Sequence, residues 1–191
     1  MDTKDIIKKI AKVHEATTDE ISAVIKNSEN DGFLFECADK VRREAYGTDV
    51  YIRGLIEFTN YCKNNCFYCG IRRDNRNIKR YRLSIDEIME CCEEGYKLGF
   101  RTFVLQGGED AGFTDDILCN MISGIKKRYS DCAVTLSLGE RTEESYKRLY
   151  DSGADRYLLR HETACEDHYR KLHPKELSCE KRKDCLRTLK K

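Results

Sequence analysis

Hydrophobic residues in the first 46 positions recur at steps of three and four residues. This period is typical of amphipathic helices, and the polar stretch at residues 27–32 predicts a break between two of them. We therefore expect two or three short helices in an N-terminal helical extension spanning residues 1–47, with no catalytic signature in it. The recurring positions are Ile6, Ile7, Ile10 and Val13, followed by Ile21, Val24 and Ile25.

After Gly47 the pattern changes to short apolar runs separated by helical stretches. Repeated strand-helix units predict an α/β fold with a parallel sheet, here with about four units in residues 48–191. Four units do not close a barrel by themselves, so we expect either that the chain continues in a longer domain or that something else covers the open strand edge. The expected strands are residues 50–58, 102–106, 133–138 and 156–159, and helices are expected to follow Ser84, Thr114, Thr142 and Pro174.

Charge and cysteine content narrow the possible functions. The 35 basic and 34 acidic residues nearly balance at a net charge of +1, which gives no overall argument for a nucleic-acid partner. No segment has the length and apolarity of a signal peptide or membrane span, so we expect no membrane partner and a cytoplasmic location. The eleven cysteines, an odd number, fit reduced thiols or metal ligands better than a disulfide framework.

Three of these cysteines, Cys62, Cys66 and Cys69, fall within eight residues directly after the first expected strand. Three thiolates leave one iron of a [4Fe–4S] cubane free to bind another molecule. In radical chemistry that molecule is S-adenosylmethionine (SAM), whose reductive cleavage yields a 5′-deoxyadenosyl radical. Ordinary buried thiols or half of a zinc site are less favoured alternatives, because zinc knuckles use CxxC pairs with a second pair downstream. We expect most of the other cysteines to be small packing residues.

Polar residues also end the later strands. Enzymes with barrel-type sheets build their sites at the carboxyl ends of the strands, so these residues are candidates for binding. A plain glycine turn at residues 107–108 and a surface ion pair between Arg160 and Glu162 remain the alternatives. At a strand pitch Arg160 and Glu162 would point one way and His161 the other. The candidates are Gln106, Gly107, Gly108, Glu109 and Asp110 after the second strand, Thr135, Ser137 and Glu140 around the third, and Arg160, His161 and Glu162 after the fourth.

Several sequence blocks together resemble the HydE family of radical SAM maturases of FeFe-hydrogenase. The cysteine loop alone is equally similar to biotin synthase and to methylornithine synthase, whereas the later blocks favour the maturase family. The blocks are residues 54–62, 69–75, 79–82, 105–110, 134–140 and 154–163.

The resemblance implies a (β/α)8 barrel of the TIM type, of which this chain supplies the first half, with a [4Fe–4S] cluster and SAM at its top. It implies that Arg182 contacts the SAM carboxylate and Glu162 its ribose or amine. It further implies a small-molecule or organometallic substrate, an electron donor such as ferredoxin or flavodoxin, and other hydrogenase maturases as partners. The implied cofactor-binding residues are Tyr68, Gly107, Gly108, Glu109, Ser137, Glu162 and Arg182, and the implied substrate-facing residues are Gln106, Thr135 and Arg160.

Two other functions stay open at this point. One is a radical enzyme that modifies an amino acid or inserts sulfur, in the manner of methylornithine synthase or biotin synthase. The other is an iron–sulfur protein without chemistry of its own. Binding and cleavage of SAM would separate the second from the rest.

Overall fold

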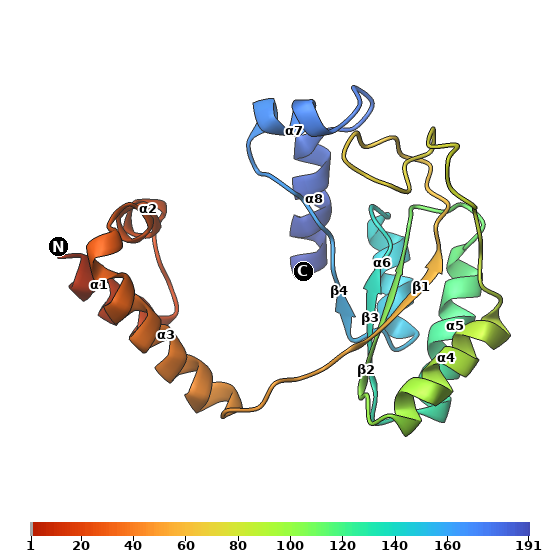
Figure 1. Cartoon of the computed structure of the whole chain (residues 1–191), viewed down its shortest axis with the longest axis horizontal. Helices are drawn as coiled ribbons and strands as arrows, with labels where there is room; N and C mark the ends of the chain where they lie inside the picture. Colours follow the sequence, from red (N-terminus) through yellow and green to blue (C-terminus); the bar gives the residue numbers. More distant parts are fainter. Residues whose placement is uncertain (1) are drawn as a thin grey trace. The chain divides into compact units, whose positions relative to one another are not determined.

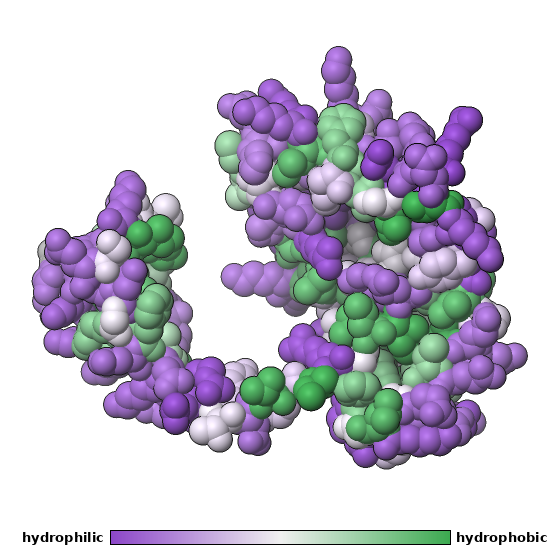
Figure 2. Space-filling view, viewed as in Figure 1, coloured by the Kyte–Doolittle hydropathy of each residue, from purple (hydrophilic) through white to green (hydrophobic). Residues whose placement is uncertain are grey.

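The structure, a computed structural model, describes residues 2–191. The chain divides into two compact units, one ending at Tyr51 and the other spanning Ile52–Lys191. Each is described by itself. The segment between them carries the exposed hydrophobic residues Val50, Tyr51 and Ile52, and hydrophobic atoms line this connection in Figure 2.

The first unit is helical, as predicted. Thr17 caps its second helix, because the Thr17 hydroxyl accepts a hydrogen bond from the Glu20 amide and the Glu20 carboxylate accepts one from the Thr17 amide. Glu20 also binds Lys9 Nζ at 2.6 Å, which ties the first two helices together. The predicted break at residues 27–32 is shorter than expected, since the third helix already begins at Asp31. The helices are α1 (Thr3–Val13), α2 (Thr18–Lys26), the 3-10 turn η1 (Ser28–Asn30) and α3 (Asp31–Tyr46).

The second unit contains the predicted parallel sheet, with its four strands in the order β1-β2-β3-β4 (Figure 1). The last strand is only two residues long and ends at Tyr157. The prediction of a strand over residues 156–159 was therefore wrong for residues 158–159. The strands are β1 (Gly54–Thr59), β2 (Thr102–Gly107), β3 (Ala133–Ser137) and β4 (Arg156–Tyr157).

Three helices cover one face of this sheet and bury the main core. Their predicted starts are confirmed, because Ser84, Thr114 and Thr142 each accept a hydrogen bond from the amide three residues later. Strand residues of one parity face these helices and are almost fully buried: Ile56, Phe58, Phe103, Leu105, Val134 and Leu136. The helices are α4 (Ile85–Lys97), α5 (Asp115–Arg128) and α6 (Glu143–Asp151).

Strand residues of the other parity point away from the helices. The parallel register places Glu57 beside Gln106 and Gln106 beside Ser137. A row of polar side chains therefore crosses three strands on the open face of the sheet, close to their carboxyl ends.

The last two helices differ from the prediction. Pro174 does not open a helix; its carbonyl accepts a turn bond from the Leu177 amide, and α8 (Cys179–Lys190) begins after the Ser178 cap. The sequence analysis also missed α7 (Glu166–Leu172), which is short and has Tyr169 as its one buried residue. Such a helix carries no apolar period to detect. Among residues 2–191, no helix combines the length and apolarity needed to cross a bilayer.

Candidate functional site

Cys62, Cys66 and Cys69 line one cavity of about 420 Å³ beyond the carboxyl ends of the strands. Within residues 2–191, no three His, Cys, Asp or Glu side chains are grouped closely enough to hold a single metal ion. Three thiols on one short loop that line the same cavity suit a centre in which each thiolate binds a separate metal atom. An iron–sulfur cubane is such a centre.

The thiols are ill suited to act as free nucleophiles. Burial raises the pKa of Cys62, and burial together with the neighbouring Cys62 and Cys69 raises the pKa of Cys66 to about 11. Without a bound cation the Cys62 and Cys66 thiols stay protonated at neutral pH, whereas coordination to iron stabilises the thiolate. The donor set and its environment thus fit an iron–sulfur cluster.

Arg80 holds the backbone around the cysteine loop. Its guanidinium donates to the carbonyl of Asn60 on the near side of the loop and to several carbonyls beyond the last cysteine. Sequence analysis missed this role, because an arginine in a basic run resembles a solvated charge. The carbonyls beyond the loop are those of Ile71 at 2.9 Å, Arg72 at 2.6 Å, Asn75 at 3.2 Å and Arg73 at 3.4 Å.

Asp110 forms a second anchor for the loop. Its carboxylate accepts hydrogen bonds from Arg82 Nε at 2.7 Å and Nη2 at 2.8 Å, and from the Thr59 hydroxyl at 2.7 Å. Burial opposes ionisation of Asp110, but the bonds from Arg82, the Gly112 amide and Thr59 outweigh it and lower the pKa of the carboxyl. Arg82 also lies 3.8 Å from the ring centre of Tyr61, directly before Cys62.

The glycines after β2 bring the backbone close to the cysteine loop. A Cβ on Gly108 would lie 2.1 Å from the Tyr61 carbonyl oxygen and 2.7 Å from Cys62 Cβ, so no side chain fits there. Gly139, after β3, has φ +76°, and a Cβ there would lie 2.1 Å from Glu109 Cγ, so it too has no room for a side chain. These contacts give the glycines a role in positioning the loop, in addition to the predicted role toward a ligand.

Arg182 is buried in the cavity wall between two carboxylates. Its Nε lies 2.8 Å from Glu140 Oε1 and its Nη2 lies 3.7 Å from Glu109 Oε1. Within residues 2–191 neither Arg182 Nε nor Glu140 Oε1 makes a hydrogen bond, so the 2.8 Å contact is an ion pair without an aligned N–H. Lys63 from the cysteine loop reaches the other oxygen of Glu109 at 3.1 Å.

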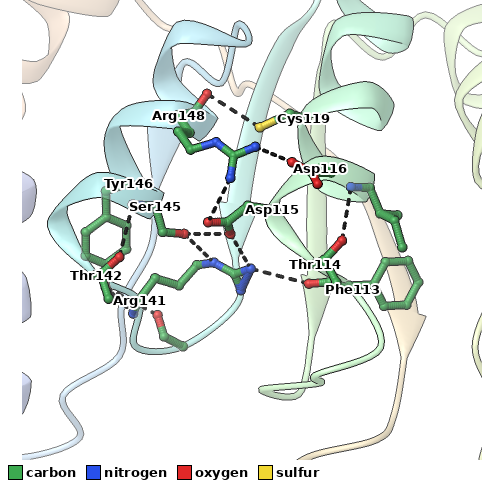
Figure 3. A network of polar contacts seen from close by, with 12 residues as sticks. Phe113, Thr114, Asp115, Asp116, Cys119, Arg141, Thr142, Ser145, Tyr146 and Arg148 are labelled. Carbon is green, nitrogen blue, oxygen red and sulfur yellow. Dashed lines mark hydrogen bonds and ion pairs between the residues drawn. The ribbon is translucent and has the colours of Figure 1, made fainter.

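A polar network between α5 and α6 fixes the segment that carries Glu140. Arg141 Nη2 donates to Asp115 Oδ1 at 2.8 Å, and Arg141 Nε donates to the Ser145 hydroxyl at 2.9 Å. Ser145 in turn donates to Asp115 at 2.8 Å. Figure 3 shows Arg141, Ser145 and Arg148 converging on Asp115, which restrains the backbone directly after Glu140.

The polar row on the open face of the sheet continues to Arg160. Gln106 donates to Glu57 at 3.1 Å and accepts from Arg160 Nη2 at 3.4 Å. Glu57 was missed by sequence analysis, although its place between the buried Ile56 and Phe58 could have indicated that it faces the open side.

The structure brings nearly all the predicted site residues to this cavity. Thr135 does not line it; this side chain is buried beneath Ser137 on the same face of β3, and its hydroxyl has no hydrogen-bond partner within the described residues. Residues 160–162 are not strand, so the predicted alternation of Arg160 and Glu162 with His161 is absent. Glu162 has φ +60°. The predicted residues in the lining are Tyr68, Gln106, Gly107, Gly108, Glu109, Ser137, Arg160, Glu162 and Arg182.

The segment around α7 packs against the cysteine loop. The Phe67 amide donates to the Leu172 carbonyl at 2.9 Å, and the Tyr68 ring meets the edge of His173 at 5.4 Å. Tyr68 also lies beside Glu162. Burial, the neighbouring Cys66 and the Glu162 carboxylate raise the pKa of Tyr68 well above its usual range, so its hydroxyl stays a hydrogen-bond donor.

The chain is similar to several characterised proteins. Its sequence is 50% identical over 157 residues to the FeFe hydrogenase maturase subunit HydE of Thermotoga maritima, covering 82% of this chain and 44% of the relative. The crystal structure of HydG, a maturase of the FeFe-hydrogenase, matches with a TM-score of 0.83 at 27% identity, over 98% of this chain and 44% of that one. Methylornithine synthase (PylB) matches with a TM-score of 0.80 at 26% identity, over 97% and 55%.

The chain spans about half the length of the proteins it matches. Residues 56–191 also match the model of the radical SAM superfamily, from within β1 to the end of the chain. That match includes the three cysteines and the cavity lining described above. The chain belongs to the radical SAM superfamily.

Proposed function

We propose that this protein is a radical SAM enzyme of FeFe-hydrogenase maturation, of the HydE type. The observation that carries the proposal is the convergence of Cys62, Cys66 and Cys69 on one cavity that Glu162 and Arg182 also line. When bound there, a [4Fe–4S] cluster and SAM together supply a 5′-deoxyadenosyl radical.

The residues of the chain have distinct tasks in this proposal. Cys62, Cys66 and Cys69 hold three irons and leave the fourth for SAM. Arg182 faces the SAM carboxylate, since a guanidinium offers two parallel donors to it. Glu162 binds a ribose hydroxyl or the amine of the same molecule.

Other predicted residues would act on SAM and substrate together. Backbone groups of Gly107 and Gly108, the Glu109 carboxylate and the hydroxyls of Tyr68 and Ser137 complete the SAM site. The pair of Gln106 and Arg160, joined at 3.4 Å, faces the substrate with Glu57 behind it. Thr135 lies one layer deeper, so we assign it to the floor of the substrate cavity in the complete barrel.

The proposal extends to substrate, partners and location. The substrate is a small organometallic complex, the reducing electron comes from a ferredoxin or flavodoxin, and the other hydrogenase maturases are partners. The proposed location of the enzyme and these partners is the cytoplasm. The 50% identity to HydE of Thermotoga maritima supports this set.

A second candidate is a radical enzyme that rearranges an amino acid. The TM-score of 0.80 to methylornithine synthase favours it as the alternative. Complementation with a version that contains the complete barrel separates the two: it restores hydrogenase activity to a host lacking its HydE-type maturase under our proposal, and leaves the host inactive under the alternative.

Cluster assembly is the first test. After anaerobic reconstitution, each of Cys62→Ala, Cys66→Ala and Cys69→Ala should lose the cluster as measured by iron content and electron paramagnetic resonance. Cys91→Ala is the matched control, because Cys91 is an exposed thiol on α4 and should keep it. An intact cluster in all three loop variants would refute the ligand assignment.

A further inference from the structure

Positive charge is concentrated in the segment that contains and follows the cysteine loop. Residues 63–82 hold seven basic side chains and one acidic side chain, although the whole chain has a net charge of only +1. Two of these, Arg80 and Arg82, are used inside the fold, and Lys63 and Arg73 have acidic partners. The remaining exposed cations of this segment form no ion pair within residues 2–191.

Arg76 and Lys79 are the exposed members of this remainder. Both side chains are exposed, and neither forms an ion pair with any carboxylate of residues 2–191. A single exposed cation is well solvated and needs no ion-pair partner. Two neighbouring cations repel each other, and binding of a partner of opposite charge relieves this repulsion.

A distant segment adds two more cations of the same kind. Lys171 and Lys175 are exposed and also lack ion pairs within the described part of the chain. Contacts of Leu172 and His173 with Phe67 and Tyr68, given above, hold this segment against the cysteine loop. In Figure 1, α7 lies next to that loop, and Figure 2 shows hydrophilic side chains projecting there. We call Arg76, Lys79, Lys171 and Lys175 the basic rim.

The cysteine loop itself reaches the surface within this rim. Phe67 and Tyr68, which lie between Cys66 and Cys69 in the sequence, are 56% and 51% exposed. Exposed aromatic side chains are enriched at protein interfaces, and charged rims around them steer partners of opposite charge. Of the two acids nearby, Asp74 pairs with Arg73 at 2.8 Å and also lies near Arg76, and Glu176 lies near Arg73, so the segment keeps an excess of positive charge.

We infer that the basic rim, together with Phe67 and Tyr68, is the docking surface for an acidic protein that donates single electrons. The inference rests on the proposed function, because only a cluster held by the three cysteines would receive the electron. In the transfer the donor is oxidised by one electron and the cluster is reduced by one, with no bond made or broken. A protein donor fits better than a nucleic acid, since the chain outside residues 63–82 is net acidic and would repel an extended polyanion.

The test compares two triple variants of the reconstituted protein. The rim variant combines Arg76→Glu, Lys79→Glu and Lys175→Glu. The matched control combines Lys40→Glu, Arg53→Glu and Lys127→Glu, three exposed cations elsewhere on the chain that also lack ion pairs. Iron content and circular dichroism verify that both variants fold and carry the cluster.

The rate of cluster reduction by reduced flavodoxin, measured anaerobically by stopped flow at low salt, is the readout. The rim variant should react about 10–100 times more slowly than the wild type, because steering by opposite charges accelerates encounter by this order. The difference should shrink as ionic strength rises. The control should react at close to the wild-type rate.

Equal rates for the rim variant and the wild type would overturn the inference, as would a loss that does not respond to salt. Displacement of flavodoxin by single-stranded RNA that binds the wild type but not the rim variant would also overturn it, in favour of a nucleic-acid surface.

Dithionite is a small reductant that reduces the cluster without docking, so it separates the docking proposal from the proposed function. If dithionite finds no reducible cluster in the wild type, the proposed function fails as well; if it reduces all variants alike, only the docking surface is at stake.

Discussion

Arg182 Nε lies 2.8 Å from Glu140 Oε1, and each of the two side chains is only 10% exposed. Glu109 faces the same guanidinium from a second direction at 3.7 Å. One buried cation in the cavity wall therefore holds two buried carboxylates, of which Glu109 also lines the cavity. Arg182 thus couples the end of β2, the segment after β3 and α8 to the place where we put the SAM carboxylate.

Replacement of Arg182 should affect both stability and cofactor binding. Arg182→Ala removes the buried cation between two carboxylates and leaves them only the exposed Lys63 and Lys181, so it should lower the free energy of unfolding by about 3 kcal/mol. In the reconstituted enzyme the variant should keep its cluster yet bind SAM weakly in calorimetry. Arg182→Lys is the control, because it keeps the positive charge and loses the planar guanidinium. Compared with Arg182→Ala, it should restore most of the stability and little of the affinity for SAM. Wild-type affinity in both variants would exclude Arg182 from the SAM site.

Gly108→Ala should displace the cysteine loop. The added Cβ would meet the Tyr61 carbonyl oxygen at 2.1 Å, and neither backbone has room to yield without moving Cys62. We expect a lower iron content after reconstitution and a reduced melting temperature.

Gly124→Ala is the matched control for this substitution. Gly124 lies within α5 and has no atom within 4 Å of an added Cβ. Alanine there should stabilise the protein by about 1 kcal/mol, because it restricts the unfolded chain and favours the helix. If Gly124→Ala lowered iron content as much as Gly108→Ala, the loop contact would not be the cause.

Arg80→Met should leave the sheet and its helices folded and loosen the cluster. The substitution leaves the carbonyls of residues 60, 71, 72, 73 and 75 without their common donor, so the backbone around the cysteine loop loses its anchor while the core under the sheet is untouched. Circular dichroism should change little, while iron is lost faster to a chelator. Arg128→Met, which removes a surface arginine paired with Glu93, should not change the rate of iron loss.

The fold could be predicted to a large extent from the sequence, because each main strand is an apolar run and each covering helix has a capping residue. Ser84 and Thr114 mark the starts of α4 and α5 by a local hydrogen bond that leaves a readable signature. The end of the chain could not be predicted as well. β4 has two residues, and the start of α8 is set by Ser178 rather than by Pro174.

The candidate site divides in the same way. The spacing of Cys62, Cys66 and Cys69 is local and could be predicted directly, whereas the bond from Arg80 to Asn60 and the bond from Thr59 to Asp110 join residues 20 and 51 positions apart. No period or spacing records such contacts. Glu57 is intermediate, since strand alternation places it on the open face but does not reveal its bond to Gln106.

Asp110→Asn should destabilise the protein in a way that depends on pH. The bonds from Arg82 and Thr59 lower the pKa of Asp110 in the folded state, so its contribution is fully present above the unfolded pKa of about 3.9 and is lost as the pH falls through the folded value. Urea denaturation should show a gap of about 2 kcal/mol between wild type and variant at pH 7, and a shrinking gap below pH ~4. Asp151→Asn, at an exposed pair with Lys147 on α6, should show little difference at any pH. A gap at Asp110 that stayed constant down to acid pH would mean that the carboxylate is not the source of this stability.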